Sequence, residues 1–251
     1  MHIADLSLTG ILEHLTTRAY SKPCGDPEGS FLLAPSAIAF GASPEGLSRT
    51  LSRIYQHARD WAPGLDIPWF VPPVHIATLD LEAGHFRLDE DSYASIAVST
   101  EYLGSIEATS LILAHEACHH ILLQSGVSYQ FKEDVILNER ITDLTMFVCG
   151  FGEIVRCGYS VVHKRNGQYV NMHLGYLDSR EYDAANRYVL AKRKVERLPG
   201  MPIRPSVWAY LCKQIGGLMN QSAWRNRNSS LLEKIVEEDE RRNRHRRPGG
   251  N

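Results

Sequence analysis

Two histidines and a glutamate in the middle of the chain have the types and the spacing to bind a metal ion and activate water. Residues 115–119 are His-Glu-Ala-Cys-His. On a helix, His115 and His119 lie one turn apart on one face, so both imidazoles can reach a single ion. Glu116 is rotated by about 100° from His115, so its carboxylate lies beside the ion without binding it. The pattern predicts a metal centre in which Glu116 is the general base.

Zinc is the ion that this set of side chains indicates. Neutral imidazoles are among the usual zinc ligands, and a catalytic zinc ion lowers the pKa of its bound water to about 7. Glu116 could take the proton from that water and pass it to a leaving amine. The sequence therefore predicts hydrolysis of a peptide bond.

A catalytic zinc ion normally has three protein ligands, so a third must come from elsewhere in the chain. The pattern H-E-x-x-H-x-x-G-x-x-H is excluded, because Leu122 and Ser125 occupy its glycine and third histidine positions. The other solution is a glutamate from the next helix, and Glu139 lies twenty positions after His119. Asp143 follows four residues later on the same helix face, where it could fix a ligand histidine by a hydrogen bond.

The motif at 115–119, followed at this distance by Asn-Glu-Arg-Ile-Thr-Asp at 138–143, resembles the glutamate zincins, whose active-site layout is similar to that of thermolysin-like peptidases. The resemblance covers about residues 106–152. It implies zinc-dependent endopeptidase activity on a protein or peptide. The site residues that it implies are the zinc ligands His115, His119 and Glu139, the general base Glu116, and the supporting residues Asn138 and Asp143.

The same resemblance implies a fold and a mode of substrate binding. It implies a two-lobed zincin fold in which the substrate lies antiparallel along an edge strand, and residues 94–100 are the candidate strand. Such peptidases stabilise the transition-state oxyanion with a histidine or tyrosine outside the two motif helices. His173 and Tyr159 are the catalytic candidates for this role, and the sequence leaves Tyr169 and Tyr176 open as well.

The elements that must position these residues follow an α+β plan. Periodicity and capping signals predict helices at about 6–19, 43–58, 106–124, 132–149, 178–196, 205–220 and 229–242. Strands are predicted at 74–81, 85–88 and 94–100, with an edge or broken strand at 30–40 and a loop or hairpin at 159–177. The strands mostly precede the helices and do not alternate with them, which is typical of an α+β fold.

We expect one zincin-like catalytic domain over residues 1–243. Its N-terminal lobe, about 1–126, would carry a small mixed sheet and the active-site helix, and its mainly helical C-terminal lobe would span about 127–243. The cleft would lie between the lobes. Residues 244–251 form a basic tail that is predicted to be disordered.

The composition of the chain indicates where the protein is found and which partners it can bind. The apolar fraction is 43%, the charged fraction is 22% and the formal net charge is −2, so the molecule has no general attraction for nucleic acid. No N-terminal signal pattern and no apolar run of about 20 residues is present. The five cysteines are irregularly spaced, which indicates reduced thiols, with Cys118 inside the motif. These features predict a cytoplasmic protein without a membrane or nucleic-acid partner.

Two other classes of protein compete with a peptidase. A zinc-binding regulatory or interaction protein could keep the scaffold without hydrolysis, but it would have no use for Glu116. A di-iron protein needs two E-x-x-H motifs on helices. The second such motif, Glu82-Ala-Gly-His85, is predicted to lie at a turn, so we discount the di-iron class.

Overall fold

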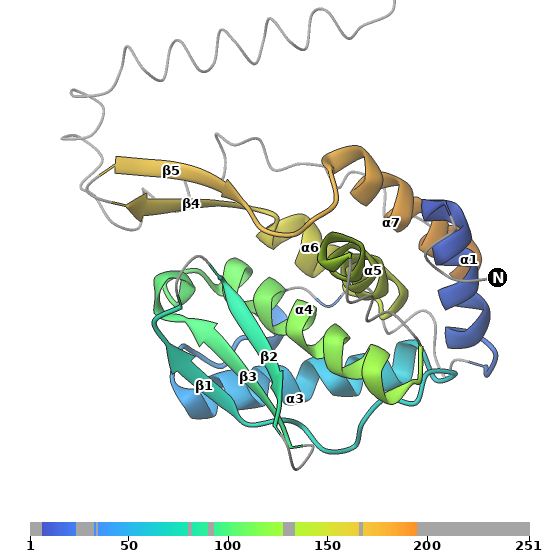
Figure 1. Ribbon diagram of the computed structural model, residues 1–251, viewed down its shortest axis with the longest axis horizontal. Coiled ribbons are helices and arrows are strands. Elements are labelled where there is room, and N and C mark those ends of the chain that lie inside the picture. The colour runs from blue at the N-terminus through green and yellow to red at the C-terminus, as the bar shows by residue number, and fades with distance from the viewer. Residues whose placement is uncertain are drawn as a thin grey trace, which may run out of the picture. The chain divides into compact units, whose positions relative to one another are not determined.

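The computed structural model describes residues 7–23, 33, 35–79, 82–89, 93–127, 134–165 and 168–194 (Figure 1). These residues form a mixed α+β structure, as predicted. The helices expected at 205–220 and 229–242, and the tail at 244–251, lie outside the described residues. None of the described helices has the length and apolar character that crossing a membrane requires.

The helices and strands follow the predicted order closely. The helices are α1 (Leu8–Ala19), α2 (Pro35–Ile38), α3 (Pro44–Trp61), α4 (Ile106–Gln124), α5 (Val135–Val148), α6 (Gly152–Gly158) and α7 (Ser179–Arg193), with a 3-10 turn η2 (Thr100–Tyr102) before α4. The strands are β1 (Val74–Ala77), β2 (Gly84–Leu88), β3 (Ala94–Ser99), β4 (Ser160–Arg165) and β5 (Gln168–His173).

Helix α4, which carries the His-Glu-Ala-Cys-His motif, is the centre of the fold. It packs against α3, α5 and α6 and against strands β2 and β3 (Figure 1). Residues on nearly every side of this helix are buried, which is typical of a helix that is apolar all round. Ser105 caps its start by accepting a hydrogen bond from the amide of Ala108, and Gly126, with φ +63°, follows its end, as predicted. The polar motif residues are therefore held on a rigid element.

Capping residues fix the ends of the helices around α4. The side chain of Ser43 accepts the Gly46 amide at the start of α3, and Asp134 accepts the Leu137 amide at the start of α5. Helix α7 begins with the predicted capping box, in which Asp178 and Glu181 each accept a backbone amide of the other. The predicted boundaries of these helices are thus confirmed within a few residues.

The three-stranded sheet has the order β1-β3-β2. Strand β3 pairs in parallel with β1 and antiparallel with β2. The prediction that residues 94–100 form the edge strand beside the site is therefore wrong. The chain turns back between Asp89 and Tyr93, whose backbone groups are hydrogen-bonded at 3.1 Å, and this turn places β2 along the outer side of β3. Strand β2 is the edge strand next to α4.

One other prediction fails and one helix was missed, both for local reasons. Within the segment predicted as an edge or broken strand, Pro35–Ile38 forms one turn of helix, and a proline suits the first position of a helix. Helix α6 was not predicted, because seven residues are too few to establish a helical period. Gly158 allows α6 to pack closely on α4, since a Cβ there would lie 2.6 Å from the carbonyl oxygen of Glu107.

Candidate metal centre

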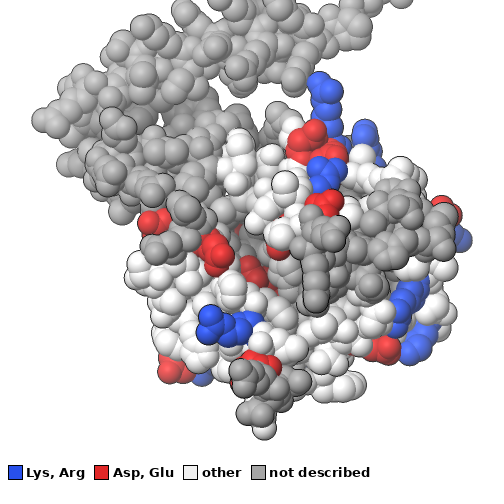
Figure 2. Space-filling model, in the orientation of Figure 1, with Lys and Arg blue, Asp and Glu red and all other residues white. Residues whose placement is uncertain are grey.

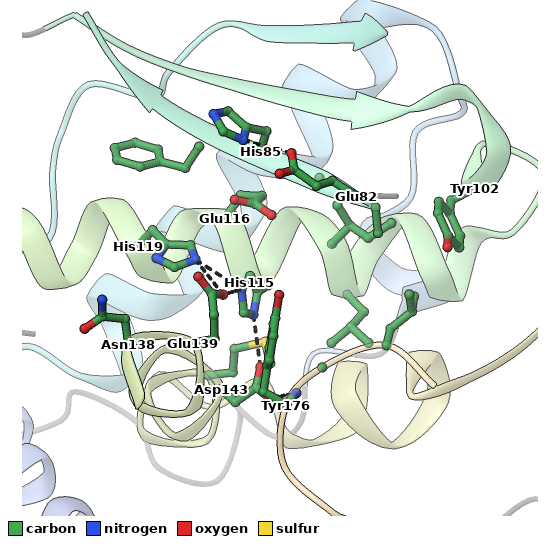
Figure 3. A pocket seen from close by; sticks show the side chains of 18 of the residues that line it. Glu82, His85, Tyr102, His115, Glu116, His119, Asn138, Glu139, Asp143 and Tyr176 are labelled. Carbon is green, nitrogen blue, oxygen red and sulfur yellow. Dashed lines mark hydrogen bonds and ion pairs between the residues drawn. The ribbon is translucent and has the colours of Figure 1, made fainter. Parts of the chain in front are cut away.

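A cleft of about 730 Å³ lies along α4. Its walls come from β2 and the residues just before it, from α4 and α5, and from the end of β5 with the residues after it, 173–176. Figure 3 shows β2 above α4, with α5 and Tyr176 below it. The residues of both sequence motifs therefore face a common space.

His115, His119 and Glu139 bring three ligand atoms together in this cleft. These atoms all lie within 4.8 Å of one another, and among the described residues they form the single cluster of three or more such side chains that could hold a metal ion. Nε2 of His115 lies 2.9 Å from Oε2 of Glu139 and 3.1 Å from Nε2 of His119. Nε2 of His119 lies 3.3 Å from the same carboxylate oxygen. The structure thus brings together the three residues that the sequence predicted as metal ligands.

Asp143 fixes the orientation of His115 by contacting the ring nitrogen that does not face Glu139. Its carboxylate is fully buried, and Oδ1 lies 3.0 Å from Nδ1 of His115. Oδ2 accepts hydrogen bonds from the amides of Tyr176 and Leu177, at 2.6 and 3.2 Å, and from the Tyr182 hydroxyl at 2.9 Å. A buried carboxylate needs such donors, because burying an unpaired charge is costly. With Nδ1 committed to Asp143, Nε2 of His115 is left for a metal ion.

Thr142 does the same for His119, and the sequence analysis assigned it no role. Its Oγ1 donates to the carbonyl oxygen of Asn138 at 3.0 Å and lies 3.2 Å from Nδ1 of His119. Because its O–H donates to that carbonyl oxygen, the hydroxyl oxygen can accept a hydrogen bond from Nδ1–H, which leaves Nε2 of His119 for a metal ion. The signal was present in the sequence, since Thr142 lies three residues after Glu139 on the same helix.

His115 and Glu139 each shift the pKa of the other. Burial favours the neutral ring of His115, but the hydrogen bonds to Asp143 and Glu139 raise its pKa well above the ordinary value. Burial likewise favours the neutral acid of Glu139, but the two histidines lower its pKa to about 2. A metal ion must replace the proton on Nε2 of His115, which faces Glu139, because a nitrogen that carries a proton cannot bind metal.

Glu116 lies in the cleft but outside the metal-binding cluster. Its side chain is 6% exposed, and no described residue makes a hydrogen bond to its carboxylate. Burial raises its pKa above the ordinary value, against the opposing charges of His115 and His119. Gly84 of β2 leaves the space for it, because a Cβ at that position would lie 2.7 Å from Oε1 of Glu116. A buried carboxylate that no described residue pairs with is suited to receive a proton from a ligand.

The four candidate donors for an oxyanion have different surroundings. His173 lines the cleft and is exposed, whereas Tyr159 is not part of the described lining and packs against His173, with ring centroids 4.8 Å apart. The side chain of Tyr169 lies outside the described residues. Tyr176 lines the cleft, and its ring stacks on His115 with centroids 6.1 Å apart. Tyr176 is therefore the candidate in direct contact with the metal-binding cluster (Figure 3).

The backbone around Tyr176 is held in place by the same buried carboxylate. Gly175 has φ +104°, and a Cβ there would lie 2.0 Å from the Tyr182 hydroxyl and 3.0 Å from Oδ2 of Asp143. Only glycine fits this turn, so it sets the direction in which the next ring enters the cleft. Burial, together with the charges of Glu139 and Asp143, raises the pKa of Tyr176 to about 12. The phenol is thus a neutral donor at physiological pH.

Asn138 and Cys118 complete the set of residues that the sequence selected. Asn138 lines the cleft beside Glu139, and its carbonyl oxygen anchors Thr142. Cys118 is fully buried and forms no disulfide, as predicted.

Comparison with known proteins finds no matching family model, no matching curated protein and no matching solved structure.

We expect Asp143→Asn to weaken the binding of a divalent metal ion, measured by titration with zinc, by about 10- to 100-fold. An amide cannot accept all the hydrogen bonds that the carboxylate accepts, so His115 loses its fixed orientation. Thermal unfolding of the metal-free variant would show how much of the loss comes from the fold.

Asp66→Asn is the matched control, because Asp66 forms only an exposed pair with Arg18 at 3.5 Å. Tyr182→Phe removes one of the donors to Asp143 and should give a smaller loss of affinity in a stably folded protein. A folded Asp143→Asn variant that binds zinc as tightly as the wild type would contradict the assigned role.

Proposed function

We propose that this chain is a zinc-dependent endopeptidase of the zincin type, with zinc bound by His115, His119 and Glu139 and with Glu116 as the general base. The observation that carries the proposal is the convergence of three possible ligand atoms in one cleft, beside a buried carboxylate that has no hydrogen-bond partner among the described residues. A purely structural zinc site has no need of that carboxylate, and structural sites are usually closed by four protein ligands.

The spacing of the ligand atoms supports zinc as the metal. A tetrahedral zinc ion with bonds of about 2.0–2.2 Å holds its ligand atoms about 3.3 Å apart. The three nitrogen and oxygen atoms lie 2.9 to 3.3 Å apart, which is close to this spacing. Two imidazoles and one carboxylate also match the His₂Glu ligand set of known zinc peptidases.

Glu116 would carry the proton during the reaction. When bound, zinc supplies a Lewis acid that polarises a carbonyl oxygen and lowers the pKa of a coordinated water. Glu116 would accept the proton of the attacking water and then donate it to the amine that leaves when the peptide bond breaks. Its burial favours the protonated form and so makes the carboxylate a better proton acceptor.

Tyr176 is the preferred donor for the oxyanion of the transition state. Its ring contacts His115, and its hydroxyl is a neutral donor that lines the same cleft. His173 also lines the cleft and is the second candidate. Tyr159 would act by packing behind His173.

The substrate chain would pair with the free edge of β2. This strand lines the cleft at Gly84, where its main chain passes against Glu116. An extended peptide added to this edge would use main-chain hydrogen bonds for affinity. It would also pass the general base and the three metal ligands.

The Glu116→Gln variant should keep one bound zinc ion and lose hydrolysis by about 100-fold or more, because a general base contributes about 10²–10⁴ to the rate. The assay is the appearance of new peptide termini, detected by mass spectrometry, when the zinc-loaded chain acts on a mixture of unfolded proteins. Glu13→Gln, on the exposed side of α1, is the control.

Hydrolysis that persists in Glu116→Gln would show that the mechanism is wrong. Zinc binding by the wild type without any hydrolysis would favour the alternative of a zinc-binding regulatory or interaction protein.

Tyr176→Phe should lower kcat by about 10- to 1,000-fold with little change in KM, because an oxyanion donor acts mainly in the transition state. The phenylalanine ring keeps the stacking on His115, so zinc content should not change. His173→Gln is the parallel variant. A loss of kcat in that variant, with none in Tyr176→Phe, would transfer the role to His173.

A further inference from the structure

A fourth carboxylate in the cleft takes no part in the metal-binding cluster. Glu82 lies just before β2 and lines the cleft on the β2 side (Figure 3). Its side chain is 56% exposed, and Oε2 lies 3.0 Å from Nδ1 of His85. No described residue makes a hydrogen bond to Oε1. Oε2 of Glu82 thus pairs with His85, and among the described residues Oε1 has no hydrogen-bond partner.

The described lining of the cleft contains four carboxylates, and its basic side chains are all histidines. It contains Glu82, Glu116, Glu139 and Asp143, and none of its described members is lysine or arginine. Figure 2 shows acidic side chains inside the hollow on this face of the molecule. A divalent ion would balance two of these four charges. The loaded cleft would therefore still attract a cation.

Glu116 provides an independent sign that this space receives a ligand. Its carboxylate is 6% exposed, faces the cleft, and has no hydrogen-bond partner among the described residues. A carboxylate that opens onto a cleft can be satisfied there by a ligand or by water. The cleft is thus a built site and not only a cluster of acidic residues at the surface.

The chain length between Glu82 and Gly84 sets where a cation would bind. Two residues span at most about 7 Å, and the main chain of Gly84 lies against Glu116. A peptide paired with β2 and cleaved beside Glu116 would pass Glu82 within about two residues of the cleaved bond. Arg87 lies further along β2, is exposed, and is not among the described lining residues.

We propose that Glu82 is a specificity-determining residue that binds a positively charged group of the substrate next to the cleaved bond. The group is a lysine or arginine side chain, or the α-ammonium of an amino-terminal residue. The position relative to the cleaved bond rests on the proposed function. The preference for a cation rests only on the cleft and its charges.

The test measures binding without turnover, in the zinc-loaded full-length chain carrying Glu116→Gln. Three mixtures of short random peptides are offered to the immobilised protein, and the retained fraction is quantified by mass spectrometry. The first mixture is N-acetylated and contains lysine and arginine. The second lacks both residues and has a free amino terminus. The third lacks both residues and is N-acetylated.

We expect retention of the first or the second mixture to exceed that of the third by about two- to fivefold, the range for a partly exposed ion pair. The first mixture identifies a side-chain cation, and the second identifies the α-ammonium. Adding Glu82→Gln should abolish the preference, whereas adding Glu13→Gln should leave it unchanged. Far-UV circular dichroism and zinc content confirm that each variant is folded and loaded.

Equal retention of the three mixtures, or a preference that survives Glu82→Gln, would overturn the proposal. Since this assay does not depend on cleavage, a failure here is distinct from a failure of the hydrolysis test.

Discussion

The buried carboxylate of Asp143 is the interaction on which the rest of the site depends. It lies on α5 and binds His115 on α4, the backbone that carries Tyr176, and the Tyr182 hydroxyl on α7. A charge that is fully buried must be surrounded by donors, so the position of each of these groups is constrained by the others. One residue thereby fixes the tautomer of His115, the spacing of two helices and the turn at the cleft wall.

The packing of α4 explains why this network can be rigid. The helix is surrounded by α3, α5, α6 and the sheet, and its neighbours on nearly all sides are apolar. His115, Glu116 and His119 therefore face the cleft from one side of a helix that is otherwise buried. Gly84 and Gly158 allow β2 and α6 to approach α4 closely. These contacts restrict the side chain of Glu116 to a position beside His115 and His119.

The sequence predicted what depends on local spacing. The pair His115 and His119 follows from one helical turn, and Glu139 and Asp143 follow from the same period on the next helix. The helix ends follow from Ser43, Ser105 and Asp178.

The sequence could not predict what depends on tertiary pairing. The order β1-β3-β2 is set by how β2 folds back on β3, so the edge strand was assigned wrongly. The preference for Tyr176 over Tyr159 requires the turn at Gly175 and its contact with Asp143. The two-lobe division at about residue 126 stays a prediction.

The central claim is that His115, His119 and Glu139 bind one zinc ion. The most direct measurement is the metal content, by inductively coupled plasma mass spectrometry, of protein purified without a chelator or a metal-affinity tag. We predict about one zinc ion per chain, the stoichiometry of a single three-ligand site. The ion should be lost in His115→Ala and retained in His14→Ala, where the exposed histidine of α1 is removed instead. Protein that contains no metal and takes up no zinc tightly on titration would contradict the account.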